Sequence, residues 1–118
     1  MQPYIRRIVA VDAHRRKTGT CPTLIHSLGT GESFAIAPLA DGFIDLASGQ
    51  RVRCEAGAIV VGDDNRTIDT GFTDDIGFSG FDPHSGEHFH GRAGGGATVT
   101  IYDARMVEYF QYALAEAG

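Results

Sequence analysis

The stretch "SFAIAPLADGFIDLASGQRVRCEAGAIVV" (residues 33–61) decides the fold class. Short apolar runs alternate with the turn steps "DG", "SG" and "AG" at intervals of about eight residues, a spacing typical of an antiparallel meander. Phe34 and Ile36 fall on one face of the first run, and Val52 and Cys54 fall on one face of the third. The stretch therefore predicts four consecutive short strands.

The segments on either side extend this pattern. "YIRRIVAVDA" (4–13) is rich in β-branched residues and predicts a strand, and "TLIHSLG" (23–29) predicts a second. The acid-rich segment 63–97 alternates only weakly and predicts short strands with a long, acid-lined loop. "ATVTIYD" (97–103) alternates strictly and predicts another strand.

The C-terminal segment "ARMVEYFQYALAEA" (104–117) predicts an α-helix. Asp103 precedes it as an N-cap residue. Met106, Phe110, Ala113 and Leu114 form a stripe at helical spacing that would dock on a sheet. The fold expected for residues 1–118 is one mainly β domain, a small antiparallel β-barrel or sandwich built as a meander, with one C-terminal α-helix packed on it.

Charge is unevenly distributed along this chain of net charge −5. Residues 1–17 hold five of the ten basic side chains, whereas residues 55–87 hold eight acids, Asp63 and Asp64 among them. We interpret both segments as solvated loops of opposite sign. The two cysteines lie in no CxxC motif, no secretory signal is seen and no apolar run is long enough to span a membrane, so we expect a cytoplasmic protein with reduced thiols.

The stretch "FDPHSGEHFHG" (81–91) is the strongest candidate for chemistry. If it is extended, His88 and His90 share a face and Phe89 points to the core. His84, with Asp82 or Glu87, could complete a set of ligands for a divalent transition metal, namely zinc, iron or nickel. The hypothesis that follows is a small metal-dependent hydrolase or oxygenase. Whether the protein is an enzyme at all stays open.

The basic N-terminal segment is a second candidate site. It could bind an anion or a nucleic acid through five side chains: Arg6, Arg7, Arg15, Arg16 and Lys17. The acidic overall balance and the lack of interleaved aromatic residues argue against nucleic acid.

The C-terminal segment carries more aromatic surface than one buried stripe needs. Tyr109 and Tyr112 could lie at the margin of a protein contact, where tyrosine is favoured. The leading hypothesis is therefore a small soluble binding module that acts through a protein partner or through self-association.

Overall fold

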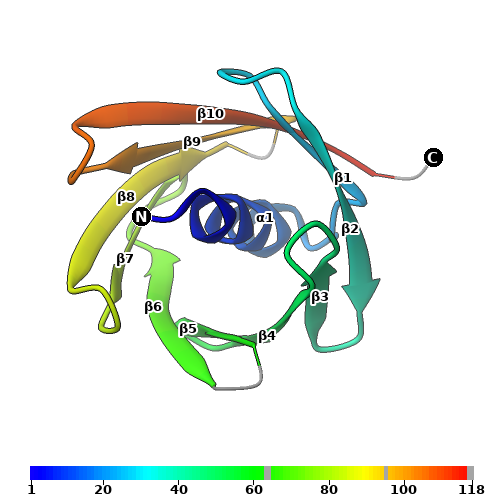
Figure 1. Ribbon diagram of the computed structural model, residues 1–118, viewed down its shortest axis with the longest axis horizontal. Coiled ribbons are helices and arrows are strands. Elements are labelled where there is room, and N and C mark those ends of the chain that lie inside the picture. Colours follow the sequence, from blue (N-terminus) through cyan, green and yellow to red (C-terminus); the bar gives the residue numbers. More distant parts are fainter. Residues whose placement is uncertain (63–64, 95, 117–118) are drawn as a thin grey trace.

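The computed structural model describes residues 1–62, 65–94 and 96–116, and in this part of the chain it contains one helix and ten strands (Figure 1). The helix, α1, spans Pro3–Thr18. The strands are β1 (Leu24–Ser27), β2 (Ser33–Leu39), β3 (Gly42–Asp45), β4 (Gln50–Glu55), β5 (Ala58–Val61), β6 (Arg66–Phe72), β7 (Gly77–Asp82), β8 (Glu87–Ala93), β9 (Thr98–Asp103) and β10 (Glu108–Ala115).

The strands form a closed antiparallel barrel. Each strand pairs with the next along the chain, and β1 pairs with β10 from Leu24 opposite Ala115 to Ser27 opposite Tyr112, which closes the ring. The predicted meander is thus confirmed as a barrel, and the four strands expected between residues 33 and 61 are β2 to β5. Closure means that none of the ten described strands is an edge strand.

The helix lies at the N-terminus and inside the barrel, not at the C-terminus (Figure 1). The strand predicted for residues 4–13 is wrong, because residues 5–14 are helical and all buried. Every side of α1 between residues 5 and 14 is buried, and the charged residues Arg6, Arg7 and Asp12 form ion pairs there, so the helix lacks the solvated polar face that marks a surface helix. Its sequence then resembles a buried strand.

Local signals nevertheless set both ends of α1. Pro3 stands in the first turn, where its missing N–H costs no helical hydrogen bond. Gly19 ends the helix with a φ of 78°, and its N–H donates to the carbonyl oxygen of Arg15 at 2.9 Å. Basic residues in the last turn favour the helix because they face the negative end of its dipole.

The C-terminal helix predicted for 104–117 is also wrong. Residues 104–107 form a turn and β10 follows, while Ala117 lies outside the described residues. The side chains that pack into the core from this segment follow the two-residue period of a strand: Phe110, Tyr112 and Leu114 face the interior. Pairing with β9 and β1 on both sides outweighs the helical stripe in this segment.

The acid-rich segment is more regular than expected. The long loop predicted within 63–97 is replaced by β6, β7 and β8. Glycines at inward positions interrupt the alternation there, because aromatic rings from the neighbouring strand cover them. A Cβ on Gly80 would lie 2.3 Å from the Phe89 ring, and one on Gly91 would lie 2.4 Å from the Phe78 ring. Asp63 and Asp64 lie outside the described residues.

The core is the contact between α1 and the inner wall of the barrel. Ile5, Ile8, Val9 and Val11 of the helix are fully buried against inward side chains such as Phe43 of β3. Barrels of similar size can hold a small ligand in this space. Here α1 occupies it. Within the described residues, no helix is long and apolar enough to cross a membrane.

Candidate functional site

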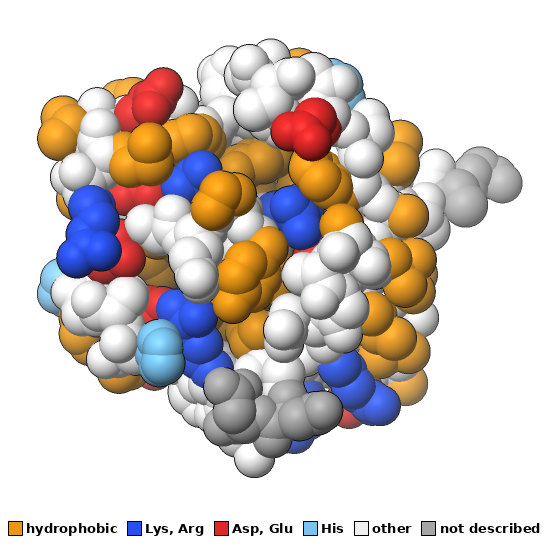
Figure 2. Space-filling model, viewed as in Figure 1, with side chains coloured by type: hydrophobic (Ala, Val, Ile, Leu, Met, Phe, Trp, Pro, Cys, Tyr) orange, Lys and Arg blue, Asp and Glu red, His pale blue; other side chains and the backbone are white. Residues whose placement is uncertain are grey.

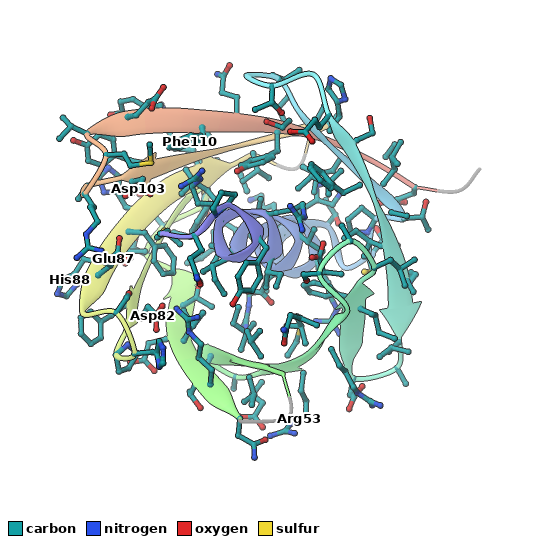
Figure 3. The ribbon with its side chains drawn as sticks, in the orientation of Figure 1. Arg53, Asp82, Glu87, His88, Asp103 and Phe110 are labelled. Carbon is teal, nitrogen blue, oxygen red and sulfur yellow. The ribbon has the colours of Figure 1, made fainter. Side chains whose placement is uncertain are left out.

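The three histidines of the predicted metal site lie on the β7–β8 hairpin. His84 lies in the turn, while His88 and His90 lie on the outside of the barrel wall, on one face as predicted. Figure 3 shows His88 on the outside of β8. His88 packs against Phe81 with ring centroids 4.5 Å apart, and His90 stacks on Tyr102 at 5.0 Å.

The two acids of that predicted site lie on the inner side of the wall. Asp82 is buried in an ion pair with Arg66, and Glu87 accepts a hydrogen bond from the α-amino group of Met1 at 2.6 Å. The wall thus separates both carboxylates from His88 and His90. Among residues 1–62, 65–94 and 96–116, no three His, Cys, Asp or Glu side chains are grouped so that they could hold a metal ion.

The basic N-terminal segment is part of α1, and its first two arginines are buried in the barrel. Arg7 forms a bidentate pair with Asp45, with N···O distances of 2.8 and 2.6 Å. Arg6 donates to Asp103 at 3.1 Å, and its guanidinium lies 3.7 Å from the centroid of the Phe110 ring. Interpreting this segment as a solvated loop was wrong, because these cations neutralise carboxylates that the strands place inside the barrel.

The rest of the basic segment lies in the last turn of α1. Arg16 donates to Asp12 at 2.7 Å and to two carbonyl oxygens at the β4–β5 turn. Lys17 donates to the carbonyl oxygen of Asp75, and Arg15 is half-buried. Four of the five residues of the predicted anion-binding set, all except Arg15, therefore attach α1 to the barrel in this fold.

The two tyrosines of the predicted contact face opposite ways. Tyr112 is buried inside the barrel, where burial raises the pKa of its hydroxyl in spite of the nearby Arg6. Tyr109 is 65% exposed on the outside of β10, and its ring lies 4.8 Å from that of Tyr102. Only Tyr109 can reach a partner in this structure.

A second group of residues gathers at the end of the barrel where α1 begins, which we call the mouth. Four loops that are described in full meet there. Three of them connect two strands through four residues, and in the fourth the N–H of Ser27 donates to the carbonyl oxygen of Glu32, so that residues 28–31 form the turn. We call them the rim: 28–31, 46–49, 83–86 and 104–107. At the opposite end, two hairpins turn through only two residues each, 40–41 and 56–57.

Three of the rim loops are built in the same way. An aspartate ends the strand before each loop, and its carboxylate accepts hydrogen bonds both from an arginine and from N–H groups of the loop. The arginine pairs are Arg7 with Asp45, Arg66 with Asp82 and Arg6 with Asp103. The loop N–H donors are those of Ser48, His84, Arg105 and Met106.

Asp103 connects α1 directly to the rim. Its Oδ1 accepts from the N–H groups of Arg105 and Met106 at 3.1 and 3.3 Å, and its Oδ2 accepts from Arg6 and the α-amino group of Met1. Burial opposes the ionisation of Asp103, but these hydrogen bonds and charges outweigh it and hold its pKa below the ordinary value. The helix inside the barrel thereby fixes the shape of the 104–107 loop.

The last residue of each rim loop has a left-handed backbone, and one of the four is not glycine. Gly31, Gly49 and Gly86 have φ angles of 76°, 75° and 73°. Val107 takes the same place in its loop with a φ of 53°. This conformation costs an L-residue about 1–2 kcal/mol, and a β-branched side chain adopts it rarely. Its side chain is also 75% exposed, so burial does not offset that cost.

Exposed apolar side chains concentrate on the same rim. Five of the six large hydrophobic residues that are exposed in the described part of the chain lie in or next to the rim loops: Leu28, Leu46, Met106, Val107 and Tyr109. Figure 2 looks at the mouth and shows hydrophobic side chains across it. Leu28, Tyr109 and Phe110 also border a groove of about 410 Å³ beside the 104–107 loop.

A charged hollow of about 410 Å³ lies on the other side of that loop, and Arg66, Glu87 and Arg105 line it. The 104–107 loop therefore stands between an apolar groove and a hollow that carries both signs of charge. Protein contacts likewise combine apolar and charged surface.

A sequence signal for the rim was present in the chain. The segments "DLASGQ" (45–50), "DPHSGE" (82–87) and "DARMVE" (103–108) share an aspartate, four loop residues and a Gln or Glu. Comparing them predicts three equivalent hairpins and identifies Val107 as the residue in the glycine position. Asp103 does bond the N–H groups that follow it, as an N-cap would, but it does so in a hairpin loop.

Compared with models of known protein families, with curated proteins and with solved structures, the chain matches none of them.

Proposed function

We propose that this protein is a protein-binding module whose binding face is the rim at the mouth of the barrel. The observation that carries the proposal is Val107, an exposed β-branched residue in a left-handed conformation that the three other rim loops give to glycine. Backbone strain that is retained at an exposed position suggests a function for the side chain. An apolar side chain in water serves binding better than it serves folding.

Two further observations support the rim as the binding face. The interior of the barrel is occupied by α1, so a ligand has to bind at the surface. The rim also holds Met106 and Tyr109, which are 52% and 65% exposed, and residues of these types are enriched in protein interfaces. A contact on the rim would bury them together with Val107.

The position of the loop is fixed before a partner arrives. Asp103 holds it through two N–H groups, and Arg6 of α1 holds Asp103. A loop that is ordered in advance loses less conformational entropy on binding. This explains why a buried ion pair stands directly beneath an exposed loop.

Site-directed photo-crosslinking tests the proposal. Tyr109 is replaced by a photoreactive phenylalanine analogue, and Leu24, an exposed apolar residue at the other end of the barrel, is replaced in a matched variant. In living cells of the source organism, we expect adducts with protein from position 109, identified by mass spectrometry, and far fewer from position 24.

A second substitution makes the result specific to the rim. Combining the position-109 crosslinker with Val107→Ser should remove the adducts, because the apolar centre of the contact is lost while the barrel stays intact. Equal labelling from both ends of the barrel, or adducts that persist in the Val107→Ser variant, would contradict a binding face on the rim.

A further inference from the structure

We infer that the partner of the rim is a second copy of this chain, paired tip to tip through the 104–107 loops about a two-fold axis. This inference rests on the proposed function, since it names the partner of the same surface. It is carried by the order of four consecutive residues: Arg105, Met106, Val107 and Glu108.

These four residues are complementary to themselves when two copies run in opposite directions. Arg105 of one copy then faces Glu108 of the other and the reverse, while Met106 faces Val107. A two-fold contact requires this kind of symmetry, in which residue i meets residue j and j meets i. The order of a cation, two apolar residues and an anion satisfies this symmetry, so one loop from each copy is enough to form the contact.

The side chains concerned are available for such a contact. Arg105 is 70% exposed, and 3.9 Å separates its guanidinium from Glu87, so it is not committed to a close ion pair. Glu108 is exposed and opens β10 beside the loop. The opposite charges lie on two different sides of the loop, since Arg105 lines the charged hollow and Glu108 lines the apolar groove.

The surface next to the loop extends the apolar contact. The groove bordered by Leu28, Tyr109 and Phe110 lies directly beside the tip. A second copy that meets the tip therefore also covers this groove. Each of the ten strands in the described part of the chain is paired on both sides, so the two copies associate through side chains and not by extending a sheet.

Charge reversal tests the pairing by sedimentation equilibrium and native mass spectrometry. The wild-type chain should be a dimer. Arg105→Glu places two acids opposite each other at both contacts, and Glu108→Arg places two cations there, so each variant alone should be monomeric. A mixture of the two variants should form a heterodimer, because each contact again pairs opposite charges. The double variant should recover the homodimer.

Arg53→Glu on the outer wall of β4 is the matched control (Figure 3). It makes the same change of charge at a half-exposed arginine and should leave the dimer unchanged. Circular dichroism on every variant checks that the barrel is folded, and the heterodimer formed from two monomeric variants provides that check internally.

Three results would overturn the inference: a wild-type chain that stays monomeric up to about 1 mM, single variants that dimerise like the wild type, or a mixture that forms no heterodimer. The inference can fail while the proposed function holds. Rim adducts with a different protein, together with a monomeric wild-type chain, would keep the rim as a binding face and remove only the second copy as its occupant.

Discussion

Replacing Val107 with glycine should make the protein more stable. The left-handed backbone at this position, with a φ of 53°, costs valine about 1–2 kcal/mol, and glycine avoids that cost. This gain is reduced by about 0.4–1 kcal/mol, because a glycine makes the unfolded chain more flexible and so raises the entropy lost on folding. The difference between the midpoints of these ranges is about 0.8 kcal/mol in favour of Val107→Gly, or a rise of about 3 °C in Tm for a domain of this size.

The reverse substitution at an equivalent loop is the matched control. Gly86 has a φ of 73°, and a Cβ placed on it meets nothing within 4 Å. Gly86→Val therefore adds backbone strain without a steric clash, and it should lower the free energy of unfolding by about as much as Val107→Gly raises it. Comparing Val107→Gly with Gly86→Val separates the effect of backbone strain on stability from the effect of side-chain packing.

Equilibrium unfolding in urea, followed by far-ultraviolet circular dichroism, measures both changes. Both substitutions are made in the Arg105→Glu background, which should be monomeric, so that loss of association does not mask the gain in stability. Val107→Gly should also abolish rim binding in the wild-type background. A Val107→Gly variant that is less stable than its parent would refute the idea that strain is retained here for binding.

Three other perturbations test the interior. Arg7→Leu should lower the free energy of unfolding by about 3–5 kcal/mol, because it removes the ion-pair partner of the buried Asp45 carboxylate. Adding Asp45→Leu should recover most of that loss. A double variant no more stable than the Arg7→Leu variant would contradict this expectation. Asp103 has a lowered pKa, so its contribution to stability is present above the unfolded value of 3.8 and is lost as pH falls through the folded value. Asp103→Asn should therefore reduce stability at pH 6 and flatten its decline below about pH 4, and parallel pH profiles for the two proteins would argue against this role. Burial and nearby Asp12 raise the pKa of Cys54 to about 12 from 9.0. In a Cys21→Ala variant at pH 8, iodoacetamide should thus label Cys54 roughly a thousandfold more slowly in the folded chain than in urea, and similar rates would show the thiol to be exposed.

The strands were predictable where the chain alternates between the inside and the outside of the barrel. Residues 33–61 do so with turn residues at regular intervals, and β2 to β5 follow that pattern. The inward side chains meet an apolar helix and the outward ones meet water, so the alternation records a real difference in environment. The same reasoning placed His88 and His90 outside and Phe89 inside.

The helix was not predictable from periodicity, because its environment has none. Every side of α1 is buried by the barrel wall, so its apolar residues are distributed over all of its faces and not along one stripe. Its charged residues were misinterpreted for a related reason. Arg6 and Arg7 form ion pairs with residues of β9 and β3, which are far away in the sequence. The residues next to them in the sequence give no sign of these buried carboxylates.

The rim could be predicted only in part. The shared pattern of "DLASGQ", "DPHSGE" and "DARMVE" is local, and it shows Val107 in a glycine position. That these loops meet at one end, with α1 beginning beneath them, depends on barrel closure between β1 and β10. No local pattern encodes that pairing.

A dilution series of two-dimensional ¹H–¹⁵N spectra tests the central claim, that the rim binds a second copy of this chain, most directly. On concentrating the wild-type protein, amide signals of the rim loops should shift, most strongly at 104–108, while those of the turns at 40–41 and 56–57 should not. Shifts at the opposite end or along the outer wall, with the rim unchanged, would contradict the account.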